Sequence, residues 1–128
     1  MNADILANVS FQKEGNMEKR EKYMESLPEE HEELCHWKSD FISDEDTYFL
    51  LYKDDCVGAV IFSEEPNFVI NNVNYFYVLF RCSWGKSINS IDENISWGRI
   101  LWSCILNKIH EFSSDKSFIV FNMSTEEA

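Results

Sequence analysis

Residues 95–121, ISWGRILWSCILNKIHEFSSDKSFIVF, carry the pattern that decides the fold. Apolar side chains recur there at helical spacing and fall on one face: Ile100, Leu101, Cys104, Ile105 and Ile109. Polar residues 113–115 interrupt this pattern, and SFIVF at 117–121 is typical of a strand. The stretch therefore predicts a long amphipathic helix over Ile95–Phe112, followed by a strand over 117–121.

Strand-like segments precede this helix. TYFLLY at 47–52 and CVGAVIF at 56–62 flank a predicted tight turn, so the two segments are expected to form a hairpin. FVI at 68–70 predicts a short strand, and VNYFYVLFRC at 73–82 is the longest and most apolar candidate, as expected of a central strand. Residues 83–94 predict a polar loop.

The N-terminal part predicts one strand and two helices. Residues 4–12 are expected to form the strand, and residues 16–25 a helix capped by Asn16. Ser26, Pro28 and Glu29 are typical of a helix start, and this second helix is expected to run from Leu27 to about Lys38. The whole predicts an α+β (mixed α/β) fold with a largely antiparallel sheet, and the length of 128 residues predicts a single domain over 1–128.

Negative charge is concentrated in one segment. Between Glu25 and Asp55 the sequence has eleven acidic and two basic side chains, so this segment carries −9 of the net charge of −12. Such a field attracts basic surfaces and repels nucleic acid and anionic membranes. The sequence therefore predicts a protein partner of positive charge, with no nucleic-acid or membrane role.

Size and charge are similar to those of bacterial immunity and antitoxin proteins, and they indicate a binding protein rather than an enzyme. The leading prediction is an inhibitor that is steered electrostatically to a basic, nuclease-like toxin and covers its active site. The residues expected at that interface are the acids of two clusters and one exposed aromatic anchor: Glu29, Glu30, Glu32, Glu33, Asp44, Glu45, Asp46 and Trp84.

The order of the predicted elements resembles the GNAT acyltransferase fold, which runs strand, two helices, a meander of strands, a long helix and a strand. Two local strings carry the resemblance. SWGRIL at 96–101 is similar to the end of the family's pyrophosphate loop where it enters the long helix. NMSTEEA at 122–128 is similar to the polar stretch after the family's fifth strand.

The resemblance implies an alternative function, a GNAT-type N-acyltransferase, complete or degenerate, that uses acetyl-coenzyme A. The residues it implies at the acyl-coenzyme A site are Arg81, Gly85, Lys86, Gly98 and Arg99. The family's signature is a basic residue or Gln, two others, Gly, another, then Gly or Ala, whereas residues 81–86 read RCSWGK. The sequence also stops at Ala128, where the family adds a helix, often with a tyrosine acid, and two strands.

This departure in glycine spacing has a chemical consequence. The backbone N–H groups of the family's loop bind the pyrophosphate of the coenzyme, and they need the glycines to approach it. The sequence therefore predicts no cofactor and no acetyl-coenzyme A binding at micromolar concentration.

Three further sites are weaker candidates. His31, Cys35 and His36 have helical spacing that brings two ligands to one face, but a structural zinc site normally needs four. A nucleophile pair of His110 with Cys82 or Cys104 is conceivable. The acidic turns at 44–46 and 54–55 lack the spacing of an EF-hand calcium loop.

The ends of the chain give two more expectations. The N-terminus MNADILANVS has neither a basic start nor a long apolar run, so the protein is expected in the cytoplasm. An uncharged strand over 117–121 near the end of the sequence suggests a third interpretation, a subunit whose partner completes its sheet.

Cysteine spacing generates a test. Without a CxxC motif or a secretion signal, Cys35, Cys56, Cys82 and Cys104 are expected to be reduced and free of metal. A thiol titration of the denatured, unreduced protein should find all four thiols, and elemental analysis should find no zinc. About one zinc per chain that disappears in Cys35→Ser would instead establish the site at 31–36.

Overall fold

The structure is a computed structural model that describes residues 7–27, 38–79, 81–84 and 96–122. Its helices are α2 (Met17–Met24), α3 (Lys38–Ser43) and α4 (Trp97–Ser113). Its strands are β1 (Val9–Lys13), β2 (Thr47–Tyr52), β3 (Asp55–Ile61), β4 (Phe68–Ile70), β5 (Val73–Val78), β6 (Arg81–Ser83) and β7 (Ser117–Asn122). This is an α+β fold, as predicted.

The strands form two sheets. One has four strands in the order β1-β2-β3-β6, all antiparallel, and the other has three in the order β4-β5-β7. β5 pairs antiparallel with β4 and parallel with β7, from Val73 opposite Ser117 to Val78 opposite Asn122. The parallel pair is joined through α4, so β5, α4 and β7 form a crossover unit.

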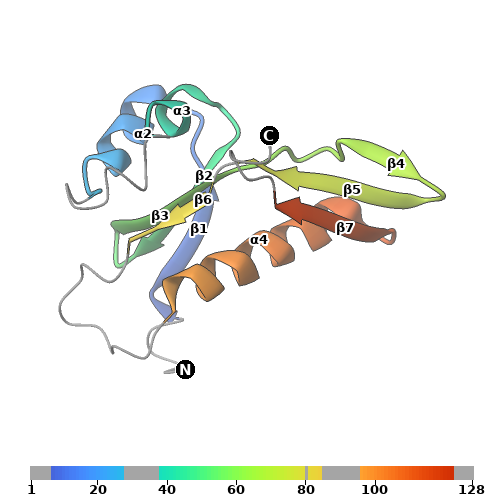
Figure 1. The fold of residues 1–128 in the computed structure, drawn as a ribbon. Coiled ribbons are helices and arrows are strands. Elements are labelled where there is room, and N and C mark those ends of the chain that lie inside the picture. Colours follow the sequence, from blue (N-terminus) through green and yellow to red (C-terminus); the bar gives the residue numbers. More distant parts are fainter. Residues whose placement is uncertain (1–6, 28–37, 80, 85–95, 123–128) are drawn as a thin grey trace.

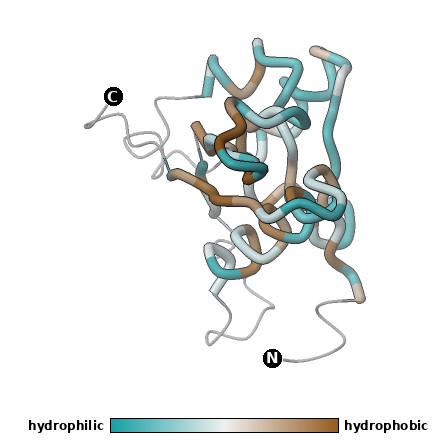
Figure 2. The backbone as a smooth tube through the Cα atoms, turned by 90° about the vertical axis from the view of Figure 1, so that its right-hand side faces the viewer, coloured by the Kyte–Doolittle hydropathy of each residue, from teal (hydrophilic) through white to brown (hydrophobic). Residues whose placement is uncertain are grey.

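The helices cover opposite faces. α2 and α3 lie together on one side of the four-stranded sheet, and α4 runs along the other side beneath both sheets (Figure 1). Apolar segments run through the middle of the molecule, with hydrophilic segments at several places on its outside (Figure 2). β2 and β3 are therefore covered on both faces, which explains their almost continuous apolar sequences.

Alternate residues of β2 supply two separate cores. Tyr48 and Leu50 pack with Leu101, Ile105 and Ile109 on the side of α4. Phe49 and Leu51 point the other way and pack with the residues beneath α2 and α3, which include Met24, Phe41 and Ala59. In each core, every second side chain of the strand faces a helix whose own apolar side chains recur about every 3.6 residues.

A buried arginine holds the small helices in place. Arg20 on α2 is only 3% exposed. Its Nε donates a hydrogen bond to the carbonyl oxygen of Ile42 at 2.7 Å, and its Nη1 donates to that of Glu14 at 2.9 Å. Because both carbonyls compensate for the loss of water around the guanidinium, a charge can be buried there.

The three-stranded sheet has an uncharged face. β4, β5 and β7 contain no Asp, Glu, Lys or Arg. On the face away from α4, Phe68 stacks on Tyr75 with 4.6 Å between ring centroids, and Phe121 contacts both Tyr75 and Tyr77. Ile119 and Phe121 each stay 43% exposed.

Most predicted elements are confirmed, with small shifts at their ends. The strand predicted over residues 4–12 is observed as Val9–Lys13, the hairpin turn has positive φ at Lys53 and Asp54, and the long helix begins after its N-cap Ser96. Most of the helix predicted over Leu27–Lys38 lies outside the described residues. Beyond the predicted end, the described residues form α3, in which Phe41 is fully buried.

One prediction is wrong. Residues 73–82 were expected to form one strand, but they divide into β5 and β6, which belong to different sheets. If the register between β6 and β3 continued towards the N-terminus of β6, Leu79 would lie opposite Phe62. Instead, the N–H of Leu79 donates a hydrogen bond to the carbonyl oxygen of Ile61 at 3.0 Å. The register therefore shifts between the two strands, and β5 takes β7 as its partner instead.

Among the described residues, no helix combines the length and the apolar character needed to cross a bilayer.

Gly58 gives a test of how β6 is seated. A Cβ atom on Gly58 would lie 3.2 Å from the carbonyl oxygen of Cys82 on β6 and 3.4 Å from Cβ of Leu50. We therefore expect Gly58→Ala to lower the free energy of unfolding by about 1–3 kcal/mol, measured by urea denaturation, because the backbone of β6 must move.

Gly15→Ala is the matched control, since a Cβ atom there would meet nothing within 4 Å. This variant should be neutral or more stable by at most about 1 kcal/mol. Equal losses of stability in the two variants would contradict the close approach of β3 and β6.

Candidate functional site

β6 forms an edge of the four-stranded sheet. It pairs with β3 on one side, with Gly58 opposite Ser83 and Val60 opposite Arg81. The other sheet lies on its other side, and the last described pair of that sheet's strands β5 and β7 is Val78 with Asn122. Among the described residues, the second edge of β6 therefore has no neighbouring strand.

The register shows which backbone groups face this open edge. The N–H of Trp84 donates to the carbonyl oxygen of Val57 at 2.8 Å, so the backbone of Trp84 faces β3. Because the direction of backbone groups alternates along an antiparallel strand, Cys82 also faces β3, whereas Arg81 and Ser83 face the open edge. Two N–H groups and two carbonyls are thus directed at the same open side.

The start of α4 lies next to the end of β6. Ser96 caps the helix by accepting a hydrogen bond from the N–H of Arg99 at 3.3 Å. A Cβ atom on Gly98 would lie 3.9 Å from Oγ of Ser83, so the first turn of α4 is directly beside β6. The positive end of the helix dipole and the exposed Arg99 make this corner favourable for an anion.

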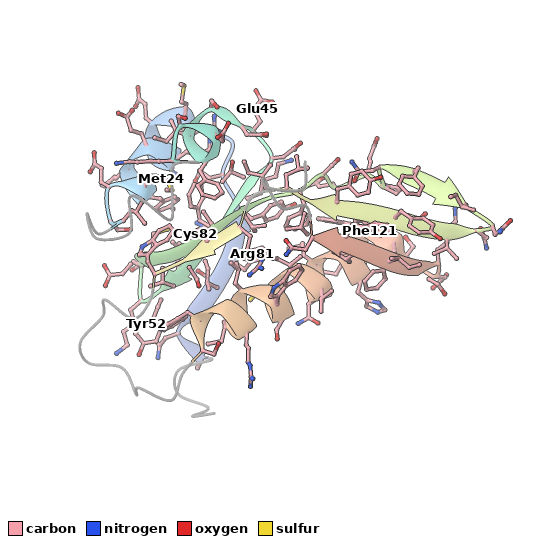
Figure 3. The ribbon with its side chains drawn as sticks, viewed as in Figure 1. Met24, Glu45, Tyr52, Arg81, Cys82 and Phe121 are labelled. Carbon is pink, nitrogen blue, oxygen red and sulfur yellow. The ribbon has the colours of Figure 1, made fainter. Side chains whose placement is uncertain are left out.

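Arg81 occupies the space between β6 and α4 (Figure 3). Its guanidinium carbon lies 4.7 Å from the ring centroid of Trp102 on α4. Its Nε is buried and has no hydrogen-bond partner among the described residues. Burial also lowers the pKa of Arg81 from its ordinary value.

The structure brings together part of the site that the family resemblance implied. Arg81 lies at the start of β6, while Gly98 and Arg99 lie in the first turn of α4 beside its end. Gly85 and Lys86 lie outside the described residues. The sequence did not predict the open backbone edge or the position of Ser83 on it, because a segment of three residues does not show which strand it pairs with.

Trp84 corrects a prediction. It was expected as an exposed interface anchor, but it is 2% exposed. Its indole N–H lies within hydrogen-bonding distance of two acceptors, the carbonyl oxygen of Cys56 at 2.8 Å and Oγ of Ser26 at 3.3 Å. The buried side chain of Trp84 therefore fixes the end of β6 and is not an exposed anchor.

The acidic residues expected at a partner interface have mixed positions. Glu45 is exposed. Asp44 accepts a hydrogen bond from the N–H of Asp46 at 2.8 Å, and Asp46 forms an ion pair with Lys13 at 3.2 Å. Asp44 and Asp46 therefore have local structural roles, and the cluster Glu29, Glu30, Glu32 and Glu33 lies outside the described residues.

The weaker candidates gain no geometric basis in the part of the chain that the structure describes. No group of three or more His, Cys, Asp or Glu residues is placed there to hold a metal ion, and positions 31–36 lie outside it. His110 sits against Phe118 at the C-terminal end of α4, six residues and about 9 Å along the axis from Cys104. Cys56, Cys82 and Cys104 form no disulfide, and burial raises the pKa of Cys56 to about 12, so that thiol is inert.

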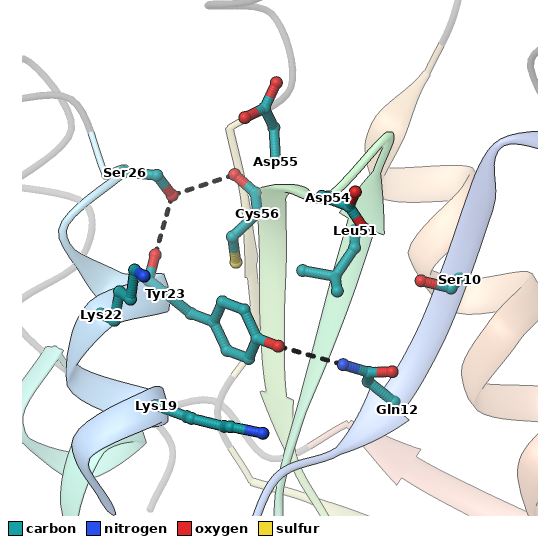
Figure 4. A pocket seen from close by; sticks show the side chains of 10 residues that line it. All are labelled: Ser10, Gln12, Lys19, Lys22, Tyr23, Ser26, Leu51, Asp54, Asp55 and Cys56. Carbon is teal, nitrogen blue, oxygen red and sulfur yellow. Dashed lines mark hydrogen bonds between the residues drawn. The ribbon is translucent and has the colours of Figure 1, made fainter.

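A separate groove lies between α2 and the four-stranded sheet. Its volume is about 450 Å³, and its lining residues are Ser10, Gln12, Lys19, Lys22, Tyr23, Ser26, Leu51, Asp54, Asp55 and Cys56. α2 contributes Lys19, Lys22 and Tyr23, and β1 faces them with Ser10 and Gln12 (Figure 4). Tyr23 and Gln12 share a hydrogen bond of 3.1 Å, and both lysines point from an exposed helix face. Most of its lining residues have polar side chains, and none of them belongs to α4.

The arrangement of elements is that of known acetyltransferases. The ribosomal-protein-alanine N-acetyltransferase of Brucella melitensis biovar Abortus 2308 matches 93% of this chain and 82% of its own with a TM-score of 0.55 and 11% identity. A possible acetyltransferase from Clostridium difficile 630 matches 93% of this chain and 80% of its own with a TM-score of 0.56 and 11% identity. The chain thus has a GNAT-like fold.

The likeness is one of fold alone at this level of identity. No protein-family model matches the sequence, and no curated protein matches it.

Trp84 provides a test of how the end of β6 is anchored. Trp84→Phe removes the indole N–H that reaches Cys56 and Ser26. The carbonyl of Cys56 still accepts a hydrogen bond from the hydroxyl of Ser26. We therefore expect Trp84→Phe to lower the free energy of unfolding by only about 1 kcal/mol more than a Trp→Phe substitution elsewhere that breaks no hydrogen bond.

Trp97→Phe is that matched control. Trp97 is 4% exposed and contacts Tyr52 edge-on, and no hydrogen bond of its indole is seen among the described residues. Thermal denaturation of both variants measures the difference. A Trp84→Phe variant no less stable than Trp97→Phe would rule out a contribution from the indole hydrogen bonds.

Proposed function

We propose that this protein is a GNAT-type N-acyltransferase that binds acyl-coenzyme A along the open edge of β6. The observation that carries the proposal is that the backbone groups of Arg81 and Ser83 face away from β3, beside the first turn of α4, and pair with no other described strand. The likeness in fold to acetyltransferases supports it.

The two parts of this corner suit the two parts of coenzyme A. The pantetheine arm carries two amides, which pair with a strand edge as another strand does. The pyrophosphate is a dianion, which suits the N-terminus of α4, Gly98 and the exposed Arg99. Gly85 and Lys86 stay predicted members of the phosphate site.

In the proposed reaction, the nitrogen of an amine attacks the thioester carbonyl of the bound acyl-coenzyme A. The new C–N bond forms, the C–S bond breaks, and the coenzyme leaves as a thiol carrying the proton that the amine gives up. The protein's contribution is to hold the thioester in one orientation along β6, which lowers the entropic cost of the encounter.

This proposal replaces the expectation that acetyl-coenzyme A does not bind. That expectation rested on the glycine spacing of residues 81–86 alone. Backbone groups at a strand edge bind without any glycine, because side chains point away from the plane of the sheet. The toxin-inhibitor interpretation stays a prediction, and two of the three acids at 44–46 already have partners within the chain.

Ser83 allows a test of the backbone edge. Because its N–H faces away from β3, Ser83→Pro removes this donor and leaves the pairing with β3 intact, as proline does in edge strands. We expect calorimetry to show saturable binding of acetyl-coenzyme A to the wild-type protein, weakened about tenfold in Ser83→Pro by the loss of one hydrogen bond.

Ser83→Ala is the control, since it removes the hydroxyl and keeps the N–H. Its affinity should match that of the wild type. Equal affinities of Ser83→Pro and Ser83→Ala would exclude the edge as the binding surface, and a wild-type protein that binds neither acetyl-coenzyme A nor another acyl-coenzyme A at about 1 mM would exclude the function.

A further inference from the structure

Arg81 has no counter-ion among the residues that the structure describes. The ion pairs among the described residues involve Lys13 with Asp46 and Glu64, and Lys108 with Glu111. Arg81 is not part of them, and its Nε is buried without an acceptor. The contrast with Arg20 is direct, since the guanidinium of Arg20 donates to two backbone carbonyls.

The folded chain gains little from such an arrangement. A buried N–H group without an acceptor is unfavourable, and desolvation lowers the pKa of Arg81. Contact with the ring of Trp102 compensates in part. An apolar side chain of similar length would fill the same space without this cost, so the charge is suited to an anion that arrives from outside.

Position along β6 indicates which part of a ligand meets Arg81. Ser83 lies beside Gly98 at the start of α4, where the pyrophosphate is proposed to bind. A strand rises about 3.3 Å per residue, so Arg81 is about 7 Å further along the edge, in the direction of the end of β5 at Val78. Trp102 lies three residues beyond Arg99 on α4, about 4.5 Å further along its axis.

Both distances, along β6 and along α4, place Arg81 towards the acyl end of a bound acyl-coenzyme A. An extended pantetheine arm that starts at the first turn of α4 and follows β6 passes Ser83 before it reaches Arg81. The guanidinium and the ring of Trp102 therefore lie where the acyl group, and not the pyrophosphate, is expected.

On the basis of the proposed function, we propose that Arg81 selects an acyl-coenzyme A whose acyl group ends in a carboxylate. The guanidinium would donate to that carboxylate in a charge-assisted pair, which is stronger than a neutral hydrogen bond. The substrate class is thus the monothioester of a dicarboxylic acid, and the group transferred to the amine retains its negative charge.

Calorimetry with acetyl-coenzyme A and succinyl-coenzyme A tests this proposal on three proteins: wild type, Arg81→Met and Arg81→Lys. We expect the wild type to bind succinyl-coenzyme A at least about tenfold more tightly than acetyl-coenzyme A. Arg81→Met should lose this preference, because its binding of succinyl-coenzyme A weakens more than its binding of acetyl-coenzyme A. Arg81→Lys should keep part of the preference, because it keeps the charge.

Arg99→Met is the matched control. Arg99 is exposed at the first turn of α4, so its loss should weaken both ligands by the same factor. Thermal denaturation adds a readout without ligand, in which Arg81→Met should be at least as stable as the wild type, since it removes a half-buried charge.

The outcomes separate the two proposals. Equal or tighter binding of acetyl-coenzyme A by the wild type overturns the selectivity and leaves the acyltransferase proposal intact. Arg81→Met weakening both ligands equally assigns Arg81 to the phosphates and overturns the inference. A melting temperature lowered by more than about 4 °C in Arg81→Met makes Arg81 structural, and binding of neither ligand overturns the function itself.

Discussion

The backbone hydrogen bonds of residues 73–79 and 81–83 are divided between two sheets, and the rest of the structure follows from this division. β5 pairs with β4 and β7, whereas β6 pairs with β3. A single continuous strand would have had the same neighbours along its whole length, and its edge would have been covered. Since β5 takes β7 as its neighbour and β6 does not, one edge of β6 has no strand partner among the described residues.

Other features hold this edge in place. Gly58 lets the backbone of β6 approach β3, and Trp84 ties the end of the strand to Cys56 and Ser26. α4 begins beside Ser83 and runs beneath both sheets, so the same helix supports the edge at its first turn and packs against Phe76 and Val78 further on. These contacts hold the edge of β6 in a defined position, which the proposed acyl-coenzyme A site requires.

Local patterns predicted most of the elements, and distant contacts explain what was missed. The period of α4 and the turn at 53–55 are properties of neighbouring residues, so the sequence predicted both. The division of residues 73–82 depends on β7, which comes after α4, and the apolar run VNYFYVLFRC has no Gly or Pro to mark it. Trp84 is buried by partners 28 and 58 positions away, so its place in a polar loop suggested exposure. For the same reason Arg81 and Arg99 were found as basic residues, whereas the backbone of Ser83 was not.

The uncharged sheet β4-β5-β7 affects how molecules of this protein meet in solution. A net charge of −12 keeps copies apart over a distance set by the ionic strength, about 30 Å at 0.01 M salt and about 10 Å at 0.1 M. One apolar face carries none of this charge; it is formed by Ile119, Phe121 and the rings of Tyr75 and Tyr77. Long-range repulsion and short-range apolar attraction thus sit on different parts of the surface, and added salt weakens only the first. Added salt should therefore let copies approach one another while the apolar face stays the same, so the solubility of the protein should depend on ionic strength.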